Sequence, residues 1–269
     1  MYRNYYRPQG QRLGGGGAKI RIMIALALAA WALFSYYGSS DYNEITGETQ
    51  RVAISPDQEI ALGLQSAPEM AQQHGGLSPD MQARARVEAI GQRLVAESAA
   101  KETDWNWQFH LLRDPQTVNA FALPGGQVFI TAALYNRLEN DDQLAGVLGH
   151  EMGHVIARHG AQHLAKQQLT QGLTGAATVA AGDQNVGRMA QMVGQMVNMK
   201  YGRNDELQSD QLGVRFMKEA GYDPHALIRV MEILEESTGG ARQPEFFSTH
   251  PNPENRIEKI KEAIAKYEG

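Results

Sequence analysis

The chain has 269 residues, of which 42% are hydrophobic and 20% charged, and its net charge is −5. This is the composition of a folded protein with a sizeable core, in one or two domains. A general nucleic-acid binder would carry a basic stripe, so we expect no nucleic-acid partner. The lack of cysteine excludes disulfides, thiolate metal sites and an N-terminal lipoprotein anchor. A metal ion would therefore need histidine and carboxylate ligands.

The first 37 residues have the pattern of a membrane segment. Residues 1–21 carry five basic residues and no acid, and residues 22–37 are uncharged and end on two tyrosines. Basic flanks stay in the cytoplasm, so residues 1–21 are predicted to be cytoplasmic. The chain after residue 37 is then predicted to lie on the opposite side of the membrane. We favour an uncleaved, single-pass anchor in a bacterial inner membrane, with the rest of the chain in the periplasm. The alternative is a signal peptide cut near residues 30–40, which would release the chain into the periplasm.

Residues 38–54 are polar and rich in turn formers, and they are predicted to be a linker with a short strand at residues 50–54. Two helices are expected to follow. Ser55-Pro56-Asp57-Gln58 has the pattern of a helix start with a capping box, and Ser78-Pro79-Asp80 is expected to start a helix in the same manner.

A small sheet is predicted next. The alternating pattern of residues 105–112 predicts a strand. Residues 118–122 and 127–131 predict a hairpin, because the segment between them holds Pro124-Gly125-Gly126.

Most of the remaining chain is predicted to be helical. Asn140 or Asp141 is expected to cap a helix that continues past residue 154. Residues 161–200 are predicted to be helix interrupted near Gly182, with a methionine-rich stripe that forms core or a mobile flap. Further helix starts are predicted at Asn204 (ending at Gly221), at Asp223-Pro224 and at Pro253. The predicted fold class is therefore α+β, mainly α.

The stretch His150-Glu151-Met152-Gly153-His154 has the spacing of a metal site on a helix. Residues four apart share one helix face, so His150 and His154 can direct two imidazoles at one ion. Zinc with three protein ligands lowers the pKa of its bound water to about 7, and Glu151 is placed to act as the general base for that water. The alternative interpretation is a surface helix that carries two solvated histidines.

Two downstream segments compete to supply a third ligand. A third histidine on the same segment is missing, because Gly160 stands where it should be. His159 and His163 are therefore predicted to be structural or solvated. The other candidates are Glu206 and Asp210, four residues apart on a later helix, of which one can bind metal and the other can accept the spare N–H of a ligating imidazole. On spacing alone, two solvated acids are an equally good interpretation.

Together these motifs resemble the M48 family of zinc metallopeptidases, which includes the HtpX, Ste24 and Oma types. Three further stretches are similar to the family: Asn-Ala-Phe-Ala-Leu-Pro-Gly-Gly-Gln-Val at residues 119–128, residues 155–159, and Ser248-Thr249-His250-Pro251 with Arg256. The similarity covers almost all of residues 55–269. The resemblance implies one metallopeptidase domain of gluzincin type over these residues, with a small sheet beside the zinc helix.

The resemblance also implies roles for the matching residues. His150, His154 and Glu206 would bind one Zn²⁺ ion. Asp210 would hydrogen-bond a ligating histidine. A zinc-bound water activated by Glu151 would attack the peptide bond. The implied role of His250 is open: it would stabilise the oxyanion during catalysis, or it would cover the metal in a resting state.

The implied substrate-binding residues lie in the predicted hairpin. Asn119 and Ala120 would line the cleft. The strand that contains Gln127 and Val128 would be an edge to which substrate adds as a further strand, through main-chain hydrogen bonds. Such binding suits unfolded or misassembled envelope polypeptides. The alternative function is a chaperone-like binder of unfolded proteins with a gated or slow metal site, against which the intact Glu151 argues.

Overall fold

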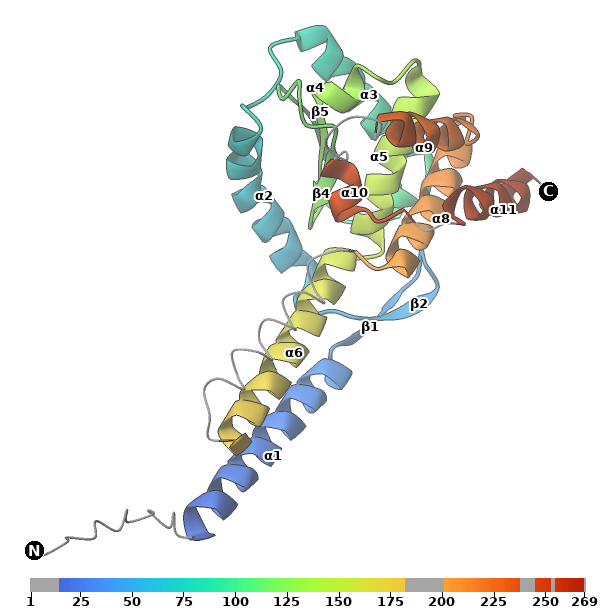
Figure 1. Cartoon of the computed structure of the whole chain (residues 1–269). Helices are drawn as coiled ribbons and strands as arrows, with labels where there is room; N and C mark the ends of the chain where they lie inside the picture. Colours follow the sequence, from blue (N-terminus) through green and yellow to red (C-terminus); the bar gives the residue numbers. More distant parts are fainter. Residues whose placement is uncertain (1–14, 182–200, 238–244, 253–254, 269) are drawn as a thin grey trace, which may run out of the picture.

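The computed structural model describes residues 15–181, 201–237, 245–252 and 255–268. Two long helices extend from one end of a globular domain (Figure 1). α1 (Gly15–Gly38) runs toward the domain, and α6 (His159–Ala181) runs away from it along α1. Among the described helices, α1 is the one that is long and apolar enough to cross a membrane, over Gly17–Gly38.

A β-hairpin joins α1 to the domain. β1 (Ser40–Asn43) pairs with β2 (Glu48–Arg51) in an antiparallel two-stranded sheet. The Asn43 amide donates to the carbonyl of Ile156 at 2.6 Å, and the Gln50 amide donates to the carbonyl of Ala157 at 2.8 Å. Residues 38–54, predicted as a linker with a short strand at residues 50–54, thus hold a hairpin whose second strand overlaps the predicted one, and the hairpin is hydrogen-bonded to the end of α5 (Asp141–Ile156).

The second sheet has three strands in the order β3-β5-β4. β3 (Gln108–Leu112) is parallel to β5 (Gln127–Thr131), and β4 (Ala120–Leu123) is antiparallel to β5. The predicted hairpin is confirmed. The prediction that β5 is an edge is wrong, because β5 is paired on both sides; within the described residues, β4 has one unpaired edge.

Seven further described α-helices and one short 3-10 segment surround this sheet and α5, and two of the predicted helix starts are confirmed. Ser55 forms the predicted capping box with Gln58, and Asn140 accepts a hydrogen bond from the Gln143 backbone N–H. The other helices and the short 3-10 segment η1 are α2 (Pro56–Gln73), α3 (Met81–Glu97), η1 (Ala99–Glu102), α4 (Ala132–Tyr135), α8 (Arg203–Glu219), α9 (Ala226–Glu236), α10 (Glu245–Thr249) and α11 (Arg256–Glu268).

Three predicted helix starts are displaced by a few residues. Asp80 rather than Ser78 caps α3, because the Asp80 carboxylate accepts a hydrogen bond from the Ala83 N–H at 2.9 Å. Gly202 rather than Asn204 precedes α8, and His225 rather than Asp223 precedes α9. The predicted start at Pro253 lies outside the described residues, as does the interruption near Gly182.

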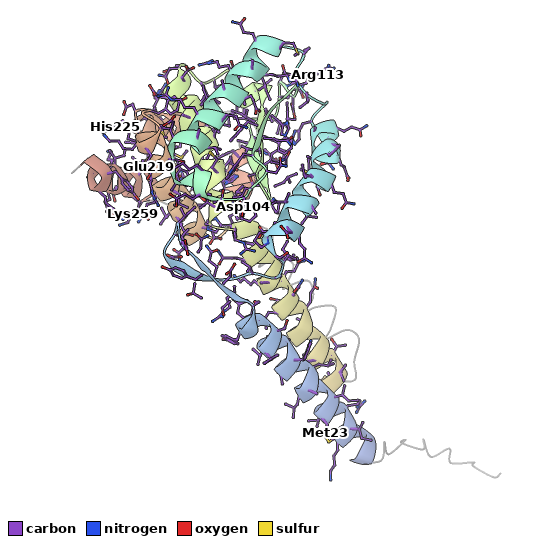
Figure 2. All side chains as sticks on the ribbon, turned by 180° about the vertical axis from the view of Figure 1, so that it is seen from behind. Met23, Asp104, Arg113, Glu219, His225 and Lys259 are labelled. Carbon is purple, nitrogen blue, oxygen red and sulfur yellow. The ribbon has the colours of Figure 1, made fainter. Side chains whose placement is uncertain are left out.

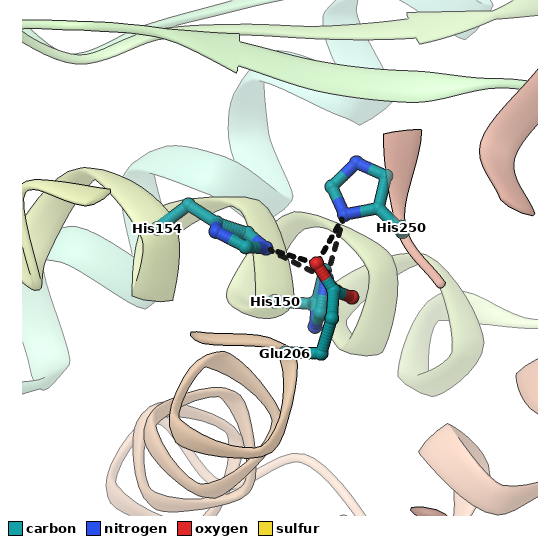
Figure 3. A group of neighbouring side chains, drawn as sticks. All are labelled: His150, His154, Glu206 and His250. Atoms are coloured by element: carbon teal, nitrogen blue, oxygen red, sulfur yellow. Dashed lines mark hydrogen bonds and ion pairs between the residues drawn. The ribbon is translucent and has the colours of Figure 1, made fainter. Parts of the chain in front are cut away.

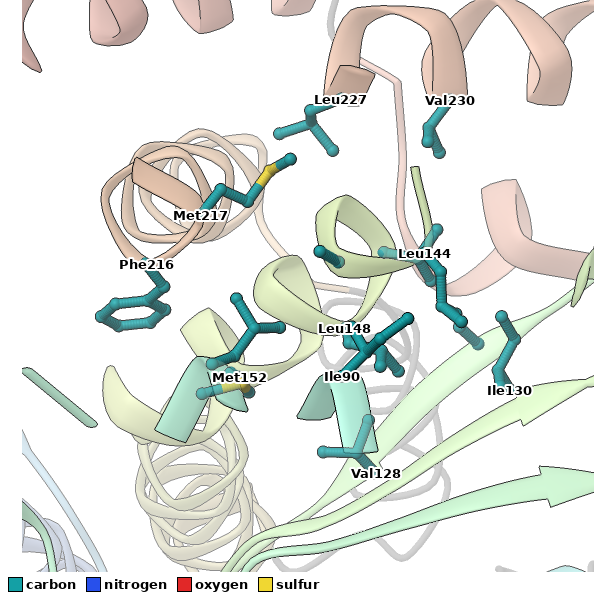
Figure 4. Packing of buried hydrophobic residues seen from close by; sticks show 14 of the residues in the cluster. Ile90, Val128, Ile130, Leu144, Leu148, Met152, Phe216, Met217, Leu227 and Val230 are labelled. Carbon is teal, nitrogen blue, oxygen red and sulfur yellow. The ribbon is translucent and has the colours of Figure 1, made fainter. Parts of the chain in front are cut away.

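α5 is the central helix, and all its residues from Gln143 to Ile156 are buried. Leu144, Leu148 and Met152 recur every four residues and so form one apolar stripe. Figure 4 shows this stripe between α3, β5, α8 and α9, where it meets Ile90, Val128, Ile130, Phe216, Met217, Leu227 and Val230. The polar side chains of a helix buried in this way need partners inside the protein.

Candidate functional site

A close crossing of α5 and α8 positions most of the site. A Cβ atom on Gly213 would lie 3.1 Å from the backbone nitrogen of His150, and one on Gly153 would lie 2.8 Å from Cα of Ser209. Only glycine permits so close an approach of two helix backbones. The crossing sets two acids of α8, Glu206 and Asp210, against the histidines of α5.

Four side chains converge at this crossing (Figure 3). His150, His154, Glu206 and His250, the last directly after α10, each direct one ligand atom to a point where all four atoms lie within 4.8 Å of one another. Nε2 of His150 is 3.2 Å from Nε2 of His154 and 3.4 Å from Nδ1 of His250. Oε1 of Glu206 is 3.4 Å from Nε2 of His154 and 3.1 Å from Nδ1 of His250. All four residues are buried.

These separations suit a divalent metal ion. With metal–nitrogen bonds of about 2.0–2.1 Å, the ligand atoms of a tetrahedral zinc site stand about 3.3 Å apart. The donor set of three imidazoles and a carboxylate is one that zinc accepts. The buried polar atoms around the cluster also favour a metal ion, because Oε2 of Glu206 and both carboxylate oxygens of Glu151 have no hydrogen-bond partner among the described residues. A buried unsatisfied group costs about 1–3 kcal/mol, and a bound cation would offset this cost.

Glu151 lies directly beside this cluster. Its Oε1 is 3.6 Å from Nε2 of His250, and its side chain is almost fully buried. Burial raises the pKa of Glu151, while His250 and His150 lower it in part. A carboxyl group with a raised pKa is suited to taking up a proton during a reaction.

Arg256 and Asp210 hold His150 from the other side. Oδ1 of Asp210 lies 2.8 Å from Nδ1 of His150, and Arg256 donates two hydrogen bonds to the same carboxylate at 2.7 and 2.9 Å. Burial would raise the pKa of Asp210, but Arg256 and His150 keep it below its usual range. Burial would likewise lower the pKa of His150, but hydrogen bonds to Asp210 and Glu206 raise it to about 9. A carboxylate in this position fixes the tautomer and orientation of a ligating imidazole.

Two aromatic rings also contact the cluster, and the sequence analysis did not predict either of them. The ring of Tyr201 stacks on His154 with 4.1 Å between centroids, and Phe246 stacks on His250 at 4.4 Å. Burial raises the pKa of Tyr201. Phe246 precedes His250 by one helical turn, so helical spacing was a usable signal for it; Tyr201 carried no such signal.

The turn after α5 brings His159 against the metal cluster. Arg158 has φ = +53°, which ends the helix. Nδ1 of His159 is 2.9 Å from Nδ1 of His154. His163 is partly buried and pairs with Asp205 at 3.0 Å. Both histidines are therefore structural, and neither is solvated.

The predicted substrate-binding residues are only partly near the site. Val128 lies in the hydrophobic core, and the side-chain amide of Gln127 donates to the carbonyl of Asn106 at 2.9 Å. The main chain of both residues is paired with β3 on one side and β4 on the other, so the prediction that substrate adds here through main-chain hydrogen bonds is wrong. Asn119 has a buried Oδ1 without a partner among the described residues, and Ala120 begins β4.

β4 borders the metal cluster. Ala122, Leu123 and Pro124 line one small pocket together with His154 and Tyr201. β4 is thus one of the two edge strands of the described sheet, and it lies next to the cluster.

The profile of peptidase family M48 matches residues 81–264. The chain belongs to peptidase family M48. Mitochondrial metalloendopeptidase OMA1 of Schizosaccharomyces pombe is 29% identical over 243 residues, which cover 88% of this chain and 70% of that relative. The beta-barrel assembly-enhancing protease of Escherichia coli is 31% identical over 182 residues, which cover 64% of this chain and 37% of that protein.

This M48 chain thus spans little more than a third of its Escherichia coli relative. Membership confirms the family predicted from the sequence motifs and the enzyme class, a metalloendopeptidase. The mainly helical α+β fold with a small sheet is confirmed as well, and the cluster of His150, His154, Glu206 and His250 is consistent with a metal centre in that fold.

Proposed function

We propose that this M48 peptidase is a zinc endopeptidase in which His150, His154 and Glu206 hold the ion. The observation that carries the proposal is the buried convergence of these three groups beside the unpartnered carboxylate of Glu151. When bound, zinc supplies Lewis-acid chemistry, which polarises the scissile carbonyl and lowers the pKa of a water molecule to about 7.

The chain's own residues would supply the proton transfers. Glu151 would accept a proton from the attacking water and deliver it to the leaving amine. Asp210, clamped by Arg256, would keep Nδ1 of His150 protonated so that Nε2 remains free for the metal. Tyr201 stacks on His154 and would restrict the rotation of that ring.

We propose that His250 covers the centre in a resting state. Its Nδ1 is as close to His150 and Glu206 as these ligand atoms are to one another, so it fills the fourth position that a catalytic zinc keeps open. Catalysis would then require His250 to move away. A chain in which it did not move would bind unfolded polypeptides without cleaving them, which is the alternative function.

The proposed substrates are unfolded or misassembled polypeptides of the cell envelope. An extended segment would add to the unpaired edge of β4 beside the cluster, with Asn119 at the start of that edge. α1 would anchor the chain in the membrane, with residues 1–21 in the cytoplasm and the domain in the periplasm. The name of the Escherichia coli relative, which refers to β-barrel assembly, supports a role in the envelope.

Removal of the metal tests the zinc proposal. The full chain in detergent is expected to contain about one zinc ion per chain and to cleave casein. Chelation should lower cleavage at least about 100-fold, and added Zn²⁺ should restore it, because the metal provides several kcal/mol of transition-state stabilisation. Cleavage that continues unchanged after the zinc has been removed would contradict the proposal.

His250→Ala tests the resting state. If His250 occupies the open position, its removal should raise casein turnover roughly threefold to tenfold with zinc content unchanged. The reason is that a larger fraction of the protein molecules then has a metal site that can take up substrate. His163→Ala is the matched control: it removes a partly buried histidine outside the cluster and should leave turnover as it is. A large fall in turnover with zinc retained would show instead that His250 acts in catalysis, and loss of zinc would show a permanent ligand.

A further inference from the structure

α1 and α6 pack closely along most of their length. Figures 1 and 2 show the two helices side by side below the domain, running in opposite directions. At their contact, a Cβ atom on Gly172 would lie 2.6 Å from Cβ of Ala32. Beyond the domain end of α6, where His159 and Ala161 are buried, the other buried residues of the pair are also small: Ala25 on α1, and Ala165 and Ala176 on α6. Small residues at a contact let helix backbones approach closely, which is the usual way that helices pair inside a membrane.

The contact between Ala32 and Gly172 fixes how the two helices are aligned. Because both rise about 1.5 Å per residue in opposite directions, residues whose numbers sum to 204 lie at the same level. Residues 167–181 of α6 therefore lie level with residues 37–23 of α1. Neither stretch contains a charged residue. Lys166, the last charge of α6 before this stretch, lies level with Gly38, the end of α1.

α1 is at the short end of the length that a membrane helix needs. Its uncharged stretch, residues 22–37, has 16 residues, which is about 24 Å of helix, and the hydrocarbon core of a bilayer is about 30 Å thick. All of this uncharged stretch must therefore be inside the membrane if α1 crosses it. A helix packed beside its residues 23–37 is then inside the membrane as well.

The polar side chains of the uncharged stretch of α6 are arranged in a way that suits the hydrocarbon core of a membrane. All three threonines of the uncharged stretch donate their hydroxyls to backbone carbonyls of α6 itself: Thr170 to Lys166 at 2.8 Å, Thr174 to Gln171 at 3.0 Å, and Thr178 to Thr174 at 2.8 Å. A hydroxyl bonded in this way exposes little polar surface to lipid. The three glutamines all lie at the domain end of the stretch, level with Tyr36, Tyr37 and Leu33, and the ten residues from Gly172 to Ala181 contain none.

We propose that residues 167–181 of α6 are a second membrane-embedded element, which packs on α1 and presents its outer face to the bilayer hydrocarbon. The inference rests on the proposed role of α1 as a membrane anchor. Figure 2 shows the same division: Met23 projects from the far part of α1, whereas Asp104, Arg113, Glu219 and Lys259 lie on the domain. Leu173 of α6 is 37% exposed and would meet lipid, as would Leu26 of α1, which is 66% exposed.

This arrangement fixes the metal cluster close to the membrane. α6 begins at His159, whose ring contacts His154 at 2.9 Å. From there to residue 167 is about 12 Å of helix. The cluster therefore lies about this distance above the bilayer. The substrate class that it can reach is the segment of a membrane-anchored polypeptide just outside the membrane.

Lipid quenching of single labels tests the insertion. The chain has no cysteine, so Leu173→Cys, Leu26→Cys and Met81→Cys each give one site for an environment-sensitive fluorophore. The full chain is placed in vesicles of phosphatidylcholine and phosphatidylglycerol. Label at residue 173 should be quenched by acyl-chain spin-labelled lipids within twofold of label at residue 26, and both should be shielded from iodide. Met81 is 68% exposed on the domain, so label there should show the reverse pattern.

The outcomes separate this inference from the proposed anchor. Quenching by lipid at residue 26 with iodide access at residue 173 would overturn the inference and keep the anchor, whereas iodide access at both would overturn both. Gly172→Leu and Gly175→Leu add the same apolar side chain, but only position 172 faces α1; a Cβ on Gly175 meets nothing within 4 Å. Lipid quenching at residue 173 should fall at least twofold in Gly172→Leu and not in Gly175→Leu. Equal quenching in both would show that α1 does not hold α6 in place.

Discussion

Glu151→Gln is expected to abolish casein cleavage while zinc content stays at about one ion per chain. Gln has the same shape as Glu but cannot accept the proton of the attacking water. Losing a general base costs roughly 10²–10⁴ in rate. Binding of zinc should be unaffected, because the three proposed ligands are other residues. The measurement is casein turnover by the full chain and by the variant, with zinc determined on both preparations.

Stability provides a second readout for the same variant. Both carboxylate oxygens of Glu151 are buried without a hydrogen-bond partner among the described residues, and burial raises the pKa of the group. Replacing a buried acid that has no hydrogen bond by a neutral amide should leave the melting temperature unchanged or raise it, as is common for residues kept for function. Wild-type turnover in Glu151→Gln, with zinc present, would remove Glu151 from the mechanism. A fall in both zinc content and melting temperature would mean that Glu151 acts in binding or folding instead.

The sequence predicted the parts of the site that depend on short-range spacing. Periodicity placed His150 and His154 on one helix face and Glu206 and Asp210 on another. That Glu206 and Asp210 belong to the metal site was predicted only from the resemblance to family M48. Which acid faces which histidine depends on the crossing of α5 and α8 at Gly153 and Gly213. That contact joins residues about 60 positions apart, and no local pattern encodes it.

Two features of the structure lie outside local pattern. Arg158 adopts a left-handed backbone conformation, which is uncommon for a residue other than glycine, and the chain after it brings His159 against His154. The side chain of Arg158 is held by Glu59 and by the carbonyl of Ile54. β5 was taken as an edge because a hairpin pattern does not reveal that a third strand, β3, pairs with the same strand in parallel.

Arg256→Met is expected to lower both the free energy of unfolding and the affinity for zinc. The guanidinium is 1% exposed, donates two hydrogen bonds to Asp210 and lies 3.3 Å from Oε2 of Glu206. Removing it leaves two carboxylates buried with less charge compensation, and breaking such a pair costs about 3–5 kcal/mol. Asp210 would no longer be held against His150, so zinc affinity should fall roughly 10–100-fold. Urea unfolding and competition with a zinc chelator measure the two effects.

A double-mutant cycle distinguishes positioning from simple loss of charge. Asp210→Asn combined with Arg256→Met removes both charges of the pair, so the loss of stability in the double variant should be smaller than the sum of the two single losses. The loss of zinc affinity should persist in the double variant, because the carboxylate that accepts the N–H of His150 is still missing.

Arg229→Met is the matched control: this partly exposed arginine pairs with Glu232 and Glu236, outside the cluster, and zinc affinity should not change. Additive losses of stability would mean that the two residues do not act as a unit. Recovery of zinc affinity in the double variant would show that Asp210 does not orient the ligand and that Arg256 acts on the ion through charge alone.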